Sequence, residues 1–193
     1  LFSPHRVPGL YEAFFNDQDK FKELYEKYEK DPSIKKKTLP AMQLFSALIK
    51  ERAETGRIYI MNVDHTNTHS SFKDTVYMSN LCQEITLPTK PLQHIDDPDG
   101  EIALCILSAI NVGTIKELDD LSELCDLAVR ALDEIIDYQK YPIKAAEIST
   151  KARRSLGVGY IGLAHYLAKN GCKYSDKKAL TKVHELTEAF QYY

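Results

Sequence analysis

The sequence predicts an α/β fold in which some of the β-strands are parallel. Two runs rich in apolar residues, 58–63 and 102–110, have the length and composition of buried strands. Residues 117–138 have the apolar spacing of a long amphipathic helix, and residues 154–170 have the pattern of a strand followed by a helix. Strands separated by helices or by long excursions favour parallel pairing, because a parallel connection needs a crossover.

Composition limits the class of protein. The 193 residues are enough for one sizeable domain, and an apolar fraction of 44% with 27% charged residues is typical of globular proteins. The net charge of −3 gives no electrostatic footprint for nucleic acid. No apolar run reaches the roughly 18 residues of a membrane span, and the start lacks the features of a secretion signal. We therefore expect a cytoplasmic protein that binds neither nucleic acid nor a membrane.

Both ends of the chain look cut. The first residue is Leu1 rather than Met, and the last segment, 183–193, still has amphipathic helical spacing where it stops. We therefore expect residues 1–193 to be part of a larger domain, so that some partners of any site lie outside the chain.

The chain is predicted to be helical from residue 11 to residue 54. Aromatic and apolar residues recur at helical spacing over 11–30, and this helix should end near Pro32. A second helix is expected over 40–54. Gly56 should close it, because glycine adopts a left-handed backbone without steric cost.

Residues 58–111 are predicted to hold two strands and a long loop between them. After the first strand comes a polar, turn-rich stretch, 64–79, and then an extended segment, 81–87, that Pro88 stops. A turn is expected at 96–100, just before the second strand. The remaining elements are expected to be a helix over 117–138, a strand and helix over 154–170, and a helix over 176–193.

The four cysteines, Cys82, Cys105, Cys125 and Cys172, form no C-x-x-C pair and show no zinc-type spacing. In a reducing cytoplasm, free cysteines are mostly buried apolar side chains. Cys125 lies within the long helix and is expected to pack there. Cys172 follows a glycine in a turn and is expected to be exposed.

One short motif, Asn80-Leu81-Cys82-Gln83-Glu84, combines three groups that radical chemistry on a sugar would use. In an extended backbone Asn80, Cys82 and Glu84 share one face at steps of ~6.6 Å, and a bend near Cys82 would converge them. A thiol can become a thiyl radical that abstracts hydrogen from carbon, a carboxylate can deprotonate an adjacent hydroxyl, and an amide can hold a second hydroxyl. On residue types alone, a buried strand thiol beside a solvated glutamate explains the motif more simply.

Two other patterns point to different chemistry. Residues Gly157 to Gly162 match the G-x-G-x-x-G of a dinucleotide-binding turn, but the strand before them is short. Close packing at a strand-to-helix junction is the favoured interpretation. His65 and His69 are four residues apart, as metal ligands on a helix would be, yet their segment looks turn-like and no third ligand is evident.

Six longer segments, in order along the chain, are more specific. They are Leu1–His5, Thr55–Ile60, Asn62–His65, Ser79–Pro91, Gly100–Cys105 and Arg153–Gly159. Together they resemble the large subunit of class I ribonucleotide reductases, and the resemblance covers essentially the whole chain. Cobalamin-dependent ribonucleotide reductases share the Asn-Cys-Glu trio, and glycyl-radical ribonucleotide reductases do not. The residues that flank the trio favour class I.

The resemblance implies that residues 1–193 are part of a ten-stranded α/β barrel, the catalytic domain, with a finger loop threading its centre. Cys82 then lies at the loop tip as the radical-bearing cysteine, Glu84 is the base for the substrate 3′-hydroxyl, and Asn80 is the amide that hydrogen-bonds the substrate. Cys105 matches one of the two cysteines that reduce the substrate and end as a disulfide. Leu107 is expected to lie beside the bound nucleotide.

The resemblance also implies a reaction and its partners. The reaction is the reduction of ribonucleoside diphosphates to deoxyribonucleotides for DNA synthesis. Several parts of the enzyme would lie outside this chain, and the chain alone should therefore be inactive. They are the second redox cysteine, the phosphate-binding loop, the radical-relay tyrosines, the cysteines that re-reduce the disulfide, and the sites for ATP and deoxynucleotide effectors. No metal or cofactor is expected within these residues. A metal-containing small subunit would supply the radical, thioredoxin or glutaredoxin would supply electrons, and the full large subunit would be a homodimer.

Two alternatives stay open at this point. One is a nicotinamide-dependent oxidoreductase that uses the glycine motif, and the other is a non-catalytic helical interaction module. A fold in which Asn80, Cys82 and Glu84 point apart would favour the interaction module. A fold in which Cys82 lies close to Cys105 and Glu84 would favour ribonucleotide reduction.

Overall fold

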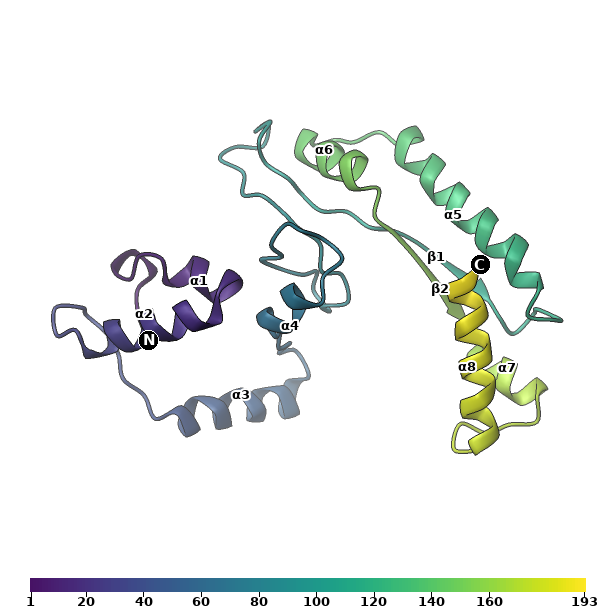
Figure 1. Cartoon of the computed structure of the whole chain (residues 1–193), viewed down its shortest axis with the longest axis horizontal. Coiled ribbons are helices and arrows are strands. Elements are labelled where there is room, and N and C mark those ends of the chain that lie inside the picture. The colour runs from purple at the N-terminus through teal and green to yellow at the C-terminus, as the bar shows by residue number, and fades with distance from the viewer. The chain divides into compact units, whose positions relative to one another are not determined.

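The computed structural model describes all 193 residues and divides into two compact units, Leu1–Thr89 and Lys90–Tyr193 (Figure 1). The first unit is helical, and the second combines helices with strands. No helix in either unit has the length and apolar character that crossing a bilayer requires.

The first unit begins with four helical segments between residues 4 and 55. The helix predicted over 11–30 is two helices, because Asp17 has an extended backbone and its side chain accepts a hydrogen bond of 2.9 Å from the Lys20 N–H, which caps the second helix. The helix predicted over 40–54 is present and ends at Gly56, whose φ of 65° is left-handed. The segments are η1 (Pro4–Arg6), α1 (Leu10–Asn16), α2 (Gln18–Lys30) and α3 (Ala41–Thr55).

The strand predicted over 58–63 is wrong. Residues 57–62 are irregular, and helix α4 (Val63–Thr68) begins at the last residue of the predicted strand. An apolar run becomes a strand only when it has a partner strand, and the first unit offers none. The prediction of a turn-like segment around His65 and His69 is also wrong, because His65 lies in helix α4 and His69 caps its C-terminal end.

A polar side chain of α4 fixes the chain that leads into the candidate site. The Asn67 side chain accepts a hydrogen bond from the Val76 N–H at 2.8 Å and donates one to the Val76 carbonyl at 3.1 Å. Val76 is fully buried, and the ring of the next residue, Tyr77, packs edge-on against Phe15 of α1 at 5.0 Å between centroids. The backbone is thus anchored four residues before Asn80.

The second unit contains the sheet. Strand β1 (Ile106–Asn111) pairs in parallel with β2 (Leu156–Ile161), and helices α5 (Asp120–Tyr138) and α6 (Lys144–Arg153) lie between them in sequence. The predicted α/β class with parallel strands is confirmed. The structure contains a two-stranded sheet and no closed barrel. The exposure of β1 alternates along the strand, whereas its apolar sequence predicts cover on both faces.

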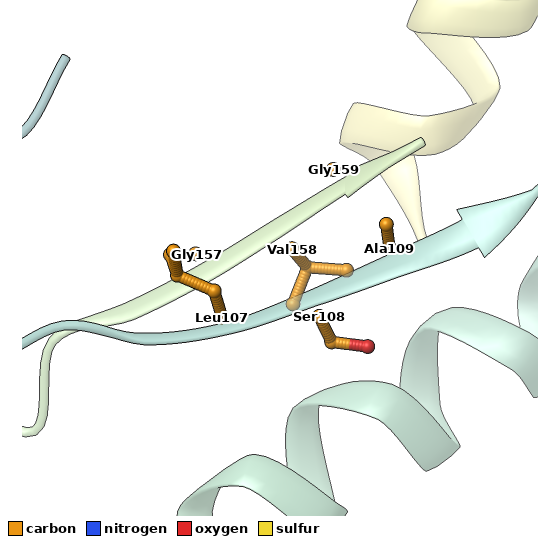
Figure 2. Close-up of a pocket in the computed structure, with 6 residues that line it drawn as sticks. All are labelled: Leu107, Ser108, Ala109, Gly157, Val158 and Gly159. Atoms are coloured by element: carbon orange, nitrogen blue, oxygen red, sulfur yellow. The ribbon is translucent and has the colours of Figure 1, made fainter. Parts of the chain in front are cut away.

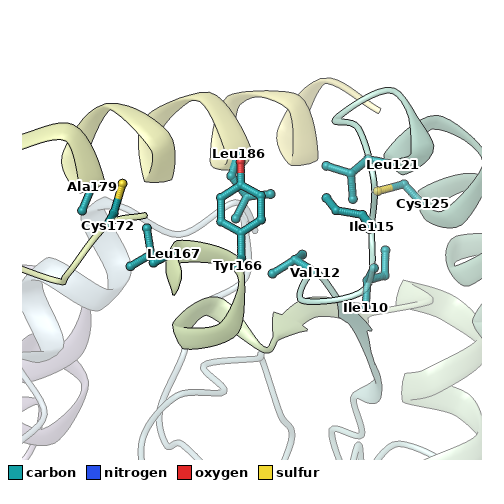
Figure 3. Close-up of a cluster of buried hydrophobic side chains, with 10 residues drawn as sticks. All are labelled: Ile110, Val112, Ile115, Leu121, Cys125, Tyr166, Leu167, Cys172, Ala179 and Leu186. Carbon is teal, nitrogen blue, oxygen red and sulfur yellow. The ribbon is translucent and has the colours of Figure 1, made fainter. Parts of the chain in front are cut away.

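The core of the second unit lies where α5 and the C-terminal helices α7 (Leu163–Lys169) and α8 (Lys177–Tyr192) meet the end of the sheet (Figure 3). Cys125 of α5 is buried there, as predicted. Cys172 is also buried, at 7% exposure, so the prediction of an exposed Cys172 is wrong. Its turn folds back so that the Cys172 N–H bonds the Leu167 carbonyl at 2.9 Å, which carries the thiol into the core.

Helix α5 buries a narrower stripe than predicted. Three residues that contribute to the apolar spacing of 117–138, namely Leu124, Leu127 and Ile135, have exposed side chains. The buried positions are Leu121, Cys125, Leu132 and Ile136. The buried residues and the exposed apolar residues lie side by side on the surface of the helix, so their hydrophobicity alone did not show which of them would be buried.

Candidate active site

The candidate loop at 80–85 is a closed turn rather than an extended strand. The Gln83 N–H bonds the Asn80 carbonyl at 3.2 Å, and the Asn80 N–H bonds the Ile85 carbonyl at 3.3 Å. The Ile85 N–H in turn bonds Oδ1 of the Asn80 side chain at 3.0 Å. Gln83 has a φ of 66°, a left-handed conformation that non-glycine residues adopt in tight turns. The prediction of an extended backbone over 81–87 is therefore wrong at its start, and the bend at Cys82 is present.

The turn presents its functional groups to solvent. Asn80, Cys82 and Glu84 are all exposed, and Cys82 is a free thiol at the apex. Oδ1 of Asn80 is committed to closing the turn, whereas its amide nitrogen makes no hydrogen bond within the chain and keeps two N–H donors. Asn80 therefore closes the turn through its side-chain oxygen, and its side-chain nitrogen remains available as a donor.

Tyr59 is a partner of Cys82 that the sequence did not predict. Its hydroxyl donates a hydrogen bond to Cys82 Sγ at 3.7 Å, across 23 residues of sequence. This hydrogen bond raises the pKa of the Tyr59 phenol, and the electrostatic influence of Cys82 and Glu84 raises it further. The phenol therefore stays protonated as a donor toward the sulfur. Tyr59 lies in the segment mispredicted as a strand, so no local pattern pointed to it.

Cys105 lies in the second unit, directly before β1. Its thiol is half-buried, and desolvation raises its pKa, so the protonated thiol is favoured. The thiol makes only a weak contact with the neighbouring Ile106 carbonyl, at 3.9 Å. Cys82 belongs to the first unit, so the predicted proximity of Cys82 and Cys105 stays a prediction.

A shallow apolar pocket follows Cys105 along the sheet. It has a volume of about 610 Å³, and Figure 2 shows the two strands that form it side by side. Leu107 is 62% exposed and contributes to the wall. All of its lining residues are uncharged; they are Leu107, Ser108, Ala109, Gly157, Val158 and Gly159.

An ion cluster ties together the segments on either side of Cys105. Glu101 is 7% exposed, and its backbone exchanges two hydrogen bonds of 3.1 Å with Lys90. Its carboxylate also pairs with Lys90 Nζ at 2.5 Å and with the Arg153 guanidinium. Burial alone would raise the pKa of Glu101, but hydrogen bonds and charges from the two cations outweigh burial and lower it. The cluster fixes the chain four residues before Cys105.

The glycine motif does not form a dinucleotide-binding turn. Gly157 and Gly159 lie inside strand β2, whereas the dinucleotide motif places its glycines in the turn after a strand. Gly162 precedes α7 with a φ of 80°, and a Cβ there would overlap Oδ1 of Asn111. Close packing at a strand-to-helix junction accounts for Gly162, as the sequence predicted.

The paired histidines form no larger cluster. The rings of His65 and His69 are 6.2 Å apart between centroids, on α4 and its C-terminal cap. Nowhere in the chain do three or more His, Cys, Asp or Glu side chains gather in a way that suits a metal ion.

Comparison of the sequence with known proteins places the chain in a family. A family model described as "Ribonucleotide reductase, barrel domain" matches residues 1–193. Over its whole length the chain is 64% identical to a ribonucleoside-diphosphate reductase subunit alpha of Haemophilus influenzae, 59% to one of Escherichia coli and 46% to one of Enterobacteria phage T4. The chain spans 26% of the length of each of these relatives. The chain therefore belongs to the ribonucleotide reductase barrel-domain family.

Proposed function

We propose that the protein containing this chain reduces ribonucleoside diphosphates to 2′-deoxyribonucleotides, with Cys82 as the radical-bearing residue. The observation that carries the proposal is the exposed Cys82 thiol at the apex of a hydrogen-bonded turn, between Asn80 and Glu84, in a chain of this family. A reactive thiol needs access to its substrate and a fixed backbone, and the turn supplies both.

The groups of the turn suit hydrogen abstraction from a ribose. A Cys82 thiyl radical takes the hydrogen atom from C3′ and becomes a thiol again, while Glu84 accepts the proton of the 3′-hydroxyl. The substrate is then a ketyl-type radical, with the unpaired electron at C3′ and a deprotonated oxygen bonded to that carbon. Asn80 donates hydrogen bonds through its amide nitrogen to a substrate hydroxyl. At the end of the cycle Cys82 returns one hydrogen atom to C3′, so that the radical is regenerated.

The reduction itself draws on Cys105 and a second thiol. The C2′–O bond breaks and the oxygen leaves as water. Two thiols together give up two electrons and two protons: one hydrogen ends on C2′, one in the water, and the sulfurs join as a disulfide. The raised pKa of Cys105 keeps it as a thiol, the form that holds the proton to be delivered. The second thiol belongs to the rest of the protein, of which this chain is about a quarter.

The same proposal includes partners beyond the chain. A metal-containing small subunit would supply the radical to Cys82, and thioredoxin or glutaredoxin would supply the electrons that re-reduce the disulfide. The full large subunit is a homodimer and binds ATP and deoxynucleotides at allosteric sites. Four free cysteines suit a reducing compartment, so we place the protein in the cytoplasm. The names of the relatives, ribonucleoside-diphosphate reductase subunit alpha, support the reaction and an assembly with a second kind of subunit.

A thiol inventory tests the proposal. The full-length subunit, with the cysteines that re-reduce the disulfide changed to serine, is pre-reduced, combined with the small subunit, and given a ribonucleoside diphosphate without external reductant. We expect deoxyribonucleotide to form while mass spectrometry finds Cys105 converted from thiol to disulfide. Cys125, which is buried on α5, should remain a free thiol and serves as the internal control. Product formation with Cys105 still reduced would contradict its role, and an absence of product would contradict the function.

A further inference from the structure

A close approach between the two strands surrounds Gly157. The strand register pairs Leu107 with Gly157. A Cβ atom at position 157 would lie 2.5 Å from Cδ2 of Leu107 and 3.4 Å from Sγ of Cys105. Figure 2 shows the Leu107 side chain beside Gly157. The backbone of Gly157 is not left-handed, so what a side chain here would change is the placement of Leu107 and the cover of the Cys105 sulfur, not the φ angle.

Gly159 provides a comparison within the same strand. It lies two residues after Gly157, so the two positions share one face of β2. A Cβ at Gly159 would meet no atom within 4 Å. The crowding at Gly157 therefore reflects what lies over it, namely Leu107 and the Cys105 thiol, and is not a general property of the strand.

We propose that Gly157 is a positioning residue for the reduction step, which acts through Cys105 and Leu107. Its missing side chain lets Leu107 lie along β2 as part of the pocket wall and leaves the Cys105 sulfur uncovered on that side. This inference rests on the proposed function. The pocket has no charged lining, so the surface that Gly157 keeps flat suits the sugar and base of a nucleotide rather than its diphosphate.

The thiol of Cys105 needs this open side. A sulfur that exchanges with a second thiol must be reached along a defined line of attack. Cys105 is already half-buried. A methyl group at van der Waals distance from Sγ would cover it further, and the displaced Leu107 would move into the space that the substrate uses.

The test compares Gly157→Ala with Gly159→Ala in the reduced full-length subunit. The readout is the rate at which iodoacetamide alkylates Cys105, measured by mass spectrometry on the Cys105 peptide. We expect Gly157→Ala to slow alkylation by about tenfold, a factor equivalent to about 1.4 kcal/mol, because the added methyl would lie against Sγ of Cys105. Gly159→Ala should leave the alkylation rate unchanged. Equal rates in the two variants would overturn the proposal.

A double variant keeps the test valid if Gly157→Ala folds poorly. Leu107→Ala removes the nearest atom that the new methyl would meet, so the added Gly157→Ala should then fold and slow Cys105 alkylation less than in the wild-type background. A merely structural role for Gly157 would not show this dependence on Leu107. The same loss in both backgrounds would contradict positioning through Leu107.

Activity provides a separate arm. With a ribonucleoside diphosphate, Gly157→Ala should lower kcat more than it raises KM, because the positioned thiol acts after binding. If the wild-type subunit reduces nucleotides but the two alanine variants alkylate alike, the inference fails and the proposed function stands. If alkylation differs as expected but the wild-type subunit reduces nothing, the proposed function fails.

Discussion

At the scale of single residues, the site depends on interactions that join distant parts of the sequence. The trio Asn80, Cys82 and Glu84 could be found from the sequence because it is contiguous. The Tyr59 hydroxyl, 23 residues away, could not, because its contact with Cys82 Sγ exists only once the turn has formed. The alternation argument for the trio was wrong, since the left-handed Gln83 converts the segment into a turn.

Tyr59 gives a pH-dependent prediction. Its pKa is raised by the hydrogen bond to Cys82 and by the electrostatic influence of Cys82 and Glu84, so the contact is intact below the ordinary tyrosine pKa and is lost as pH rises through the raised value. Cys82→Ala should shift the Tyr59 midpoint downward. The midpoint is obtained from the ultraviolet absorbance titration of the full-length subunit minus that of a Tyr59→Phe variant. An unchanged midpoint in Cys82→Ala would contradict the contact.

At the scale of elements, helices with strong hydrophobic periodicity were predicted well from the sequence. Short segments of mixed composition were not. Helix α3 and its Gly56 cap were predicted from spacing alone. Helix α6 was missed because its buried face consists of small or polar residues, Ala145, Ala146, Ser149 and Thr150, which give little hydrophobic contrast. The run 58–63 has strand-like composition but no strand to pair with, and pairing is a tertiary property.

The junction between β2 and α7 yields a matched pair of variants. Gly162 and Gly171 both have left-handed φ angles, 80° and 64°, so alanine should cost each about 1 to 2 kcal/mol. At Gly162 the methyl would also overlap Asn111 Oδ1, which accepts a hydrogen bond from the Gly113 N–H at 3.1 Å. At Gly171 it would meet nothing within 4 Å.

We therefore expect Gly162→Ala to destabilise the sheet by about 1 to 3 kcal/mol more than Gly171→Ala does. The measurement is hydrogen exchange of the Val112 amide, which bonds the Ile161 carbonyl at 3.0 Å across the strands. Equal exchange rates in the two variants would show that backbone conformation alone explains the glycine at 162.

At the scale of the whole molecule, the chain matches one part of its relatives' length. It spans 26% of its relatives, and apolar side chains such as Leu124, Leu127 and Phe45 are exposed within it. The sequence predicted the α/β class and the family, because both are distributed along the chain. It did not predict the Glu101 cluster, whose members Lys90 and Arg153 come from separate segments.

The Glu101 cluster should make local stability depend on pH. The pKa of Glu101 is lowered from its ordinary value of 4.5, so its stabilisation is present above that value and is lost as pH falls through the lowered one. At neutral pH Glu101→Gln should lower the opening free energy of the Ile102 amide, bonded to the Ala145 carbonyl at 3.2 Å, by about 3 kcal/mol.

The control for this prediction is Glu147→Gln. Glu147 also pairs with two lysines, Lys144 and Lys151, but it is more exposed than Glu101, so its loss should have a clearly smaller effect. Hydrogen exchange of the full-length subunit at several pH values separates the two variants. If the effect of Glu101→Gln is as large at pH 3 as at pH 7, the ionised carboxylate is not its source.

The most direct measurement concerns Cys82 itself. The full-length subunit carrying Cys82→Ser is combined with the small subunit, and both deoxyribonucleotide formation and nucleotide binding are measured, with Cys172→Ala as the control because Cys172 is a buried core thiol. We expect reduction to fall by at least about a thousandfold, as when a reacting group is removed, with substrate binding nearly intact and the control active. Appreciable reduction by Cys82→Ser would contradict the account.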